Sequence, residues 1–126
     1  MTAPQISLGA FNLEAQEPTT LAAFWAAVTG AVASVGGESV YLPPVGPGGF
    51  GMFFQRQTGP RPEHQASHLD LTVPWGARRA EVQRLLGLGA TFCWDVLDEV
   101  PHVQWTTLAD PEGNRFCVAE HPPQTD

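Results

Sequence analysis

The chain carries the same order of sequence patterns twice, and this internal repeat restricts its fold more than any other feature. In each half, an apolar extended segment precedes an apolar-periodic segment that ends at "VTGA" or "GLGA". Further extended segments follow, so the order predicted for each half is β-α-β-β-β. One such unit alone would leave a sheet face uncovered. We therefore predict an α+β fold in which two paired βαβββ modules form curved mixed sheets around a cleft, with the helices outside.

The first half is expected to begin with a strand in "ISLGAFNLEA", although the alternation of apolar residues breaks at Gly9 and Ala10. Pro18 lies near the start of the next helix, where Thr19 or Thr20 is the expected cap. Gly30 is the expected end of that helix. The helix should bury one stripe with the spacing i, i+3, i+4, i+7, which consists of Leu21, Phe24, Trp25 and Val28. Strands are predicted in "ESVYL" and "FGMFFQRQ".

The second half opens with "HLDLTV", whose strict alternation predicts a strand with His68, Asp70 and Thr72 on one face. The segment "GARRAEVQRLLGLGA" predicts a helix that ends at Gly87 or Gly89. Its buried stripe should be Val82, Leu85 and Leu86. Strands are expected in "TFCW", "VQWTTL" and "RFCVAE", with "ADPEGN" as a turn before the last of them.

Composition agrees with many short elements in one domain. Charged residues make up 15% of the 126 residues, and there are 13 glycines and 12 prolines. We expect a single domain over residues 1–126. Module one should occupy about 6–57, a polar proline-containing linker about 58–67, and module two about 68–120.

The formal net charge of −7 argues against a nucleic acid partner, because a phosphate backbone would be repelled. No basic cluster or long apolar stretch indicates a membrane partner. The N-terminal segment lacks the pattern of a secretory signal, so we expect a cytoplasmic protein. The two cysteines, Cys93 and Cys117, are then expected to be free thiols.

Four segments together resemble the vicinal oxygen chelate superfamily, and within it the small glyoxalase-like domain proteins, also known as glyoxalase/bleomycin-resistance proteins. These segments are "LAAFWAAVTG", "HLDLTV", "VQRLLGLGA" and "WTTLADPEGNRFCV". The resemblance implies two βαβββ modules that form a cleft. It also implies that members often pair, so a homodimer is considered.

In metal-using members of this superfamily, four inward side chains from strands one, four, five and eight bind a divalent ion. The matching positions here fall near Ala10, near Gln55, on His68 and on Cys117. Hard cations prefer oxygen ligands, whereas this set offers a methyl group, an amide, an imidazole and a thiol. Zn²⁺ accepts His and Cys as ligands, but two strong protein ligands are too few for a good zinc site. We therefore expect no metal site and no cofactor.

The resemblance implies that the face carrying His68 and Asp70 lines the cleft, where an imidazole beside a carboxylate can act as a general base. These two residues are the candidate catalytic pair; the alternative is that His68 is only a cavity histidine. Cys117 is a candidate nucleophile or, more simply, a buried inert thiol. The candidate ligand-binding residues are Asn12, Phe53, Gln55, Trp105, Thr107 and Cys117, and Arg115 is also expected to face the cleft.

The leading hypothesis is a metal-independent, glyoxalase/bleomycin-resistance-like protein that binds a small organic molecule in the cleft between its modules. A metal-dependent lyase, isomerase or dioxygenase that uses His68 is the first alternative, and a non-catalytic interaction module is the second. The sequence leaves open whether the chain catalyses a reaction.

Overall fold

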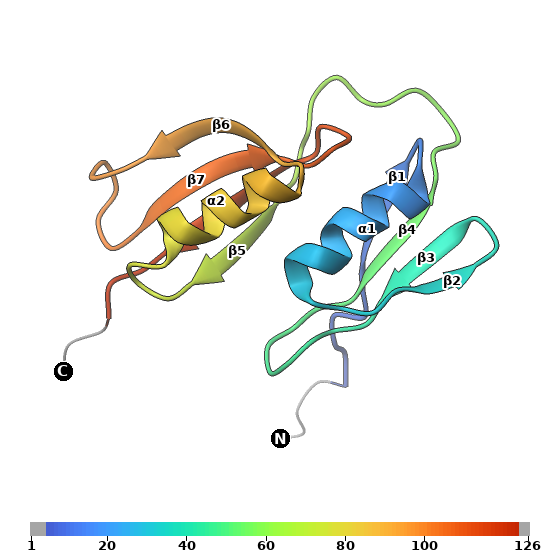
Figure 1. The fold of residues 1–126 in the computed structure, drawn as a ribbon, viewed down its shortest axis with the longest axis horizontal. Helices are drawn as coiled ribbons and strands as arrows, with labels where there is room; N and C mark the ends of the chain where they lie inside the picture. Colours follow the sequence, from blue (N-terminus) through green and yellow to red (C-terminus); the bar gives the residue numbers. More distant parts are fainter. Residues whose placement is uncertain (1–4, 124–126) are drawn as a thin grey trace. The chain divides into compact units, whose positions relative to one another are not determined.

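The computed structural model describes residues 5–123, which form two compact units that join between Arg61 and Pro62. Each unit is a four-stranded mixed sheet with one helix packed on one face (Figure 1). The order of elements in each unit is β-α-β-β-β, which confirms the predicted α+β fold with two βαβββ modules. Neither helix within residues 5–123 has the length and apolar character needed to cross a bilayer.

The first unit contains β1 (Phe11–Ala15), α1 (Pro18–Thr29), β2 (Ser34–Gly36), β3 (Ser39–Leu42) and β4 (Met52–Arg56). Its strands, which we call sheet A, have the spatial order β1-β4-β3-β2. Strand β1 runs parallel to β4, and the other pairs are antiparallel.

The second unit repeats this topology with β5 (Leu69–Val73), α2 (Arg78–Leu88), β6 (Thr91–Val96), β7 (Gln104–Ala109) and β8 (Arg115–Glu120). Its strands, which we call sheet B, have the order β5-β8-β7-β6, again with one parallel pair, β5 with β8. In both units the parallel pair joins the first strand to the last, and the helix supplies the crossover that such a pair requires.

Three details of the first unit differ from the sequence prediction. Strand β1 begins at Phe11 rather than Ile6, and the side chains of Ile6 and Leu8 are exposed, because the alternation is lost at Gly9 and Ala10. Strand β2 was not located, because its three residues are too few to show a period. The N-cap of α1 is Glu17 without a side-chain bond, since Pro18 at the first helical turn already lacks one of the donors that a cap would satisfy.

The core of the first unit is apolar throughout. Leu21, Phe24 and Trp25 of α1 are buried as predicted, and the two rings meet edge to face with centroids 5.4 Å apart. Each buried side chain of this size contributes roughly 1.5–3 kcal/mol. The helix packs on a sheet face whose buried side chains are Val40, Leu42, Met52 and Phe54. Gly30 ends α1 in the left-handed conformation, as predicted.

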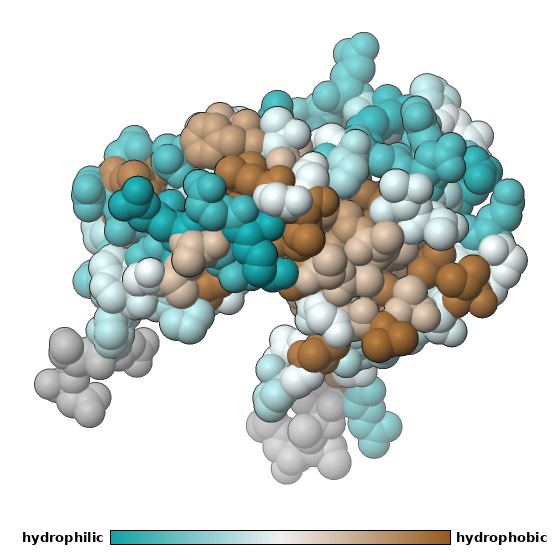
Figure 2. Space-filling view, viewed as in Figure 1, coloured by the Kyte–Doolittle hydropathy of each residue, from teal (hydrophilic) through white to brown (hydrophobic). Residues whose placement is uncertain are grey.

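Helix α2 packs differently, because it has little apolar surface to bury. Val82 and Leu85 are buried as predicted, whereas Leu86 is half-buried. The outward surface of α2 is hydrophilic in Figure 2, and that of α1 is more apolar. The third buried residue of α2 is Arg78, which is 7% exposed and was not predicted.

The buried guanidinium of Arg78 connects α2 to three strands of sheet B. Its NH1 nitrogen donates to Thr106 Oγ1 at 2.6 Å, and Thr106 in turn donates to Asp95 Oδ1 at 2.6 Å. Its Nε lies 2.9 Å from Glu120 Oε2, close enough for an ion pair although the N–H is not aligned for a hydrogen bond. Asp95, Thr106 and Glu120 belong to β6, β7 and β8, so one side chain fixes the position of the helix over most of the sheet.

We predict that Arg78→Met destabilises the chain by about 3–5 kcal/mol, because it leaves the buried carboxylate of Glu120 without a charge partner. The double variant Arg78→Met/Glu120→Gln should recover part of this loss. The measurement is the free energy of unfolding in urea. Arg79→Met, at the exposed neighbouring position, is the control and should change stability by less than about 0.5 kcal/mol. An equal loss in Arg78→Met and Arg79→Met would contradict the proposed role of the ion pair.

Candidate functional site

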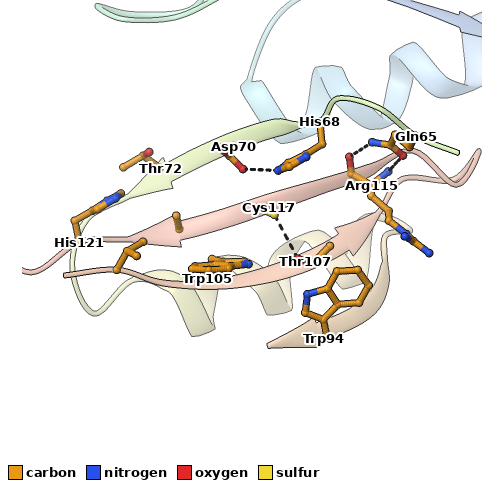
Figure 3. Close-up of a pocket in the computed structure, with 12 residues that line it drawn as sticks. Gln65, His68, Asp70, Thr72, Trp94, Trp105, Thr107, Arg115, Cys117 and His121 are labelled. Atoms are coloured by element: carbon orange, nitrogen blue, oxygen red, sulfur yellow. Dashed lines mark hydrogen bonds and ion pairs between the residues drawn. The ribbon is translucent and has the colours of Figure 1, made fainter. Parts of the chain in front are cut away.

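A pocket of about 520 Å³ lies on the face of sheet B that points away from α2 (Figure 3). Every residue that lines it belongs to the second unit. Strand alternation explains the position: Phe116, Val118 and Glu120 of β8 are buried on the helix side, so Cys117 and Ala119 between them face the pocket.

The side of β5 that faces the pocket is the side predicted from the sequence. His68, Asp70 and Thr72 all line the cavity, whereas Leu69 and Leu71 point to the helix side. His68 Nε2 lies 3.1 Å from Asp70 Oδ1, and both side chains are at least half exposed. An exposed pair of this kind adds no more than about 1 kcal/mol to stability. Its significance is that it holds an imidazole beside a carboxylate at the pocket wall.

The sheet register brings Asp70, Cys117 and Thr107 into one row across β5, β8 and β7. Thr107 Oγ1 and Cys117 Sγ are 3.3 Å apart and share a hydrogen bond. The donor atoms of His68, Asp70 and Cys117 all lie within 4.8 Å of one another. The structure therefore groups three predicted site residues, His68, Asp70 and Cys117, and places Thr107 next to them.

Burial raises the pKa of the Cys117 thiol, the bond from Thr107 lowers it, and the nearby carboxylate of Asp70 raises it further, with a net upward shift. The thiol form, which is the weaker nucleophile, is favoured. Because the pKa is higher in the folded than in the unfolded chain, the associated stability is complete below the unfolded pKa and falls as pH rises above it.

Two tryptophans contribute the aromatic part of the wall. Trp105 of β7 was predicted and lines the pocket beside Ala119, its partner on β8. Trp94 of β6 was not predicted. A register shift between Phe92 and Trp94 inserts Cys93 as an extra residue, so that Trp94 pairs with Thr107 and shares its face. This bulge reverses the facing that simple alternation from Phe92 would give.

Arg115 lies at the start of β8 with its backbone and side chain both held. The Gln65 side chain accepts a hydrogen bond from the Arg115 backbone N–H at 2.9 Å and donates to its carbonyl at 2.8 Å. The guanidinium carbon lies 5.3 Å from the ring centre of Trp94, a cation–π contact. Figure 3 shows Gln65 against Arg115, with the indole of Trp94 close by.

The turn before β8 has the structure that its sequence predicts. The Asp110 carboxylate accepts hydrogen bonds from the backbone N–H groups of Glu112 and Asn114, both at 3.0 Å. Gly113 has a φ of 86°, the left-handed conformation that glycine adopts without strain. This turn fixes where β8 begins and thus where Arg115 and Cys117 lie.

The other predicted ligand-binding residues belong to the first unit and are not part of this pocket. Asn12 and Phe53 are paired neighbours on β1 and β4, and Gln55 lies two residues further along β4. All three lie on the face of sheet A opposite its buried side chains. Their role in binding stays a prediction.

The sequence analysis missed five residues that line the pocket, namely Gln65, Trp94, Val103, Ala119 and His121. Ala119 was detectable, because it alternates with Cys117 in a predicted strand. Gln65, Val103 and His121 lie outside the strands, where no periodicity marks a facing direction.

The superfamily implies a divalent metal ion, and the second unit fits a hard cation poorly. The cluster of His68, Asp70 and Cys117 offers an imidazole, one carboxylate and a thiol, whereas Mg²⁺ and Mn²⁺ prefer oxygen ligands. The set is a better match for a borderline ion such as Zn²⁺, and Asp70 adds a third donor to the two that the sequence indicated.

The family described as the glyoxalase-like domain matches residues 10–119 of the chain. No protein with a curated description matches the sequence significantly.

Three solved structures that share the fold are distant in sequence. A glyoxalase/bleomycin resistance protein/dioxygenase family enzyme from Burkholderia phytofirmans PsJN is 18% identical with a TM-score of 0.77, covering 93% of this chain and 100% of that chain. The fosfomycin resistance protein FosX from Mesorhizobium loti is 12% identical with a TM-score of 0.65, covering 96% and 95%. TioX from Micromonospora sp. ML1 is 17% identical with a TM-score of 0.63, covering 92% and 99%.

We predict that iodoacetamide at pH 8 modifies Cys93 faster than Cys117, because Cys117 is buried and its pKa is raised. Mass spectrometry of peptides from a time course gives both rates. In Cys93→Ser, labelling of Cys117 should stay slow until denaturant is added. Equal rates in the folded protein would show that Cys117 is an accessible, activated thiol.

Proposed function

Because the chain belongs to the glyoxalase-like domain family of the vicinal oxygen chelate superfamily, we propose that it binds a small organic molecule in the pocket on sheet B without needing a metal ion. The observation that carries this proposal is the composition of the pocket wall. Two indoles stand among polar side chains in a cavity of about 520 Å³, within the size range of small-molecule sites.

The chemistry of Cys117 supports binding over catalysis by a thiolate. Its pKa is raised rather than lowered, which is the opposite of what a nucleophilic cysteine needs. The names of two structural neighbours support a role directed at small molecules. One is a fosfomycin resistance protein, and the other is an enzyme of the glyoxalase/bleomycin resistance protein/dioxygenase family.

A metal-dependent enzyme is the second candidate, and the cluster of His68, Asp70 and Cys117 is the observation that favours it. Lewis-acid polarisation of a substrate oxygen is the chemistry that a bound Zn²⁺ supplies. Without an ion, His68 oriented by Asp70 offers a general base at the pocket wall.

A homodimer and a cytoplasmic location belong to the proposal as further expectations. Native mass spectrometry of the purified protein reports the oligomeric state together with any co-purified ligand or ion.

We predict that Ala119→Phe abolishes ligand binding, because a phenyl group in place of a methyl group fills the space beside Trp105. The readout is loss of the co-purified small molecule in native mass spectrometry. Ala80→Phe, on the exposed side of α2, is the control for added hydrophobic volume and should retain the molecule. Retention in both variants would place the ligand elsewhere.

We predict that Zn²⁺, Mn²⁺ and Ni²⁺ leave the melting temperature of the wild type unchanged, because a metal-independent binder gains no stability from them. An ion-dependent rise that is lost in His68→Ala and kept in His64→Ala would establish the second candidate instead. His64 is a suitable control because it is exposed and does not line the pocket.

A further inference from the structure

The chemical class of the ligand can be inferred from the charges on the pocket wall. The chain has 13 acidic residues, and its six basic residues are all arginines. Carboxylates form ion pairs with Arg56, Arg78 and Arg84. Within residues 5–123, no carboxylate lies within ion-pair distance of Arg115, although the chain as a whole is strongly acidic. This arginine lines the pocket.

The backbone of Arg115 is held, and its guanidinium lies against the Trp94 ring, before any ligand arrives. Gln65 fixes the backbone of Arg115 through two hydrogen bonds, and Trp94 supports its cationic group from one side. A planar guanidinium can offer two parallel N–H donors to a carboxylate. Because its neighbours already restrict it, less side-chain entropy is lost when an anion binds.

The remaining ionisable groups of the wall also favour an anion. Among residues 5–123, Asp70 is the only carboxylate that lines the pocket, and it is engaged by His68 at 3.1 Å. His121 lines the other end and can carry only positive charge. An amine would therefore find one carboxylate that already has a partner, whereas an acid would find a free guanidinium.

The space beside Trp105 suits a flat apolar group. Its partner on β8 is Ala119, and Cys117 is the next residue on the same face, so small side chains leave room along the indole. Ala119, the partner of Trp105, and Arg115 are four residues apart on β8, which corresponds to roughly 13 Å along the strand, and Cys117 lies midway between them. A fused ring over Ala119 and Cys117 can therefore direct an acidic substituent toward Arg115.

We propose that the pocket on sheet B selects planar aromatic acids, with the ring against Trp105 and the carboxylate on the guanidinium of Arg115. This inference rests on the proposed function, because it names the class of molecule that the same pocket binds. Arg115 is thus the residue that determines specificity, and Trp105 supplies the ring contact.

The test compares two probes that differ only in charge, 2-naphthoate and 2-naphthamide, by isothermal titration calorimetry at pH 7.5. A charge-assisted hydrogen bond should make the naphthoate bind about 10- to 100-fold more tightly. Benzoate and 9-anthroate, each with its amide, extend the comparison to one and three rings.

Arg115→Gln should remove the preference for the acid and leave the affinity for the amide nearly unchanged. Arg79→Gln removes the same charge from an exposed position of α2 that does not line the pocket, so it should keep the preference. This pair separates a local contact from the effect of net charge.

Equal affinities of acid and amide for the wild type would overturn the selectivity for acids, and the proposed function would stand. A preference that survives in Arg115→Gln would overturn the role of Arg115. If none of the six probes binds, the aromatic-acid inference fails. The proposed function is then judged separately by the co-purified molecule and its loss in Ala119→Phe.

Discussion

The geometry of the second unit depends on the buried guanidinium of Arg78. Helix α2 buries few apolar side chains, so its attachment to sheet B relies on polar partners from three strands. Each partner is adjacent in sequence to a residue of the pocket wall: Asp95 follows Trp94, Thr106 precedes Thr107, and Glu120 follows Ala119. Because neighbours along a strand point to opposite faces, the network under the helix also fixes the side chains on the other side. The same three strands, β6, β7 and β8, therefore determine both the packing of α2 and the shape of the pocket.

The two units share a topology and differ in the forces that hold them. In the first, α1 brings two aromatic rings and Leu21 against an apolar sheet face. In the second, an ion pair and two short hydrogen bonds add to the apolar contacts of Val82 and Leu85. A buried charge is worth less to stability than apolar packing, but it tolerates fewer arrangements of its partners. The unit with the pocket is thus the one in which directional side-chain contacts also join the helix to the strands.

The fold was predictable from sequence because its signals are local and repeated. The glycines at the helix ends and the alternation in "HLDLTV" each depend on a few adjacent residues. The alternation placed His68, Asp70 and Thr72 on one face, and the family resemblance assigned that face to the cleft. The features that the sequence analysis did not predict depend on contacts between distant residues. Trp94 enters the wall through a bulge at Cys93, which alternation cannot anticipate. Arg78 lies in the first turn of a helix, where an arginine is ordinarily solvated, and its partners come from β6, β7 and β8.

Gln65 shows how a segment without regular structure can act as part of a sheet. Its amide bonds the N–H and C=O of Arg115 as a neighbouring strand would, and it lies three residues before His68. The spacing between these two residues therefore sets where the imidazole enters relative to the guanidinium. An insertion or deletion of one residue between them would move one group against the other while every strand stayed intact. In homologues with this arrangement, the length of that short connection, rather than its composition, should be the trait under selection.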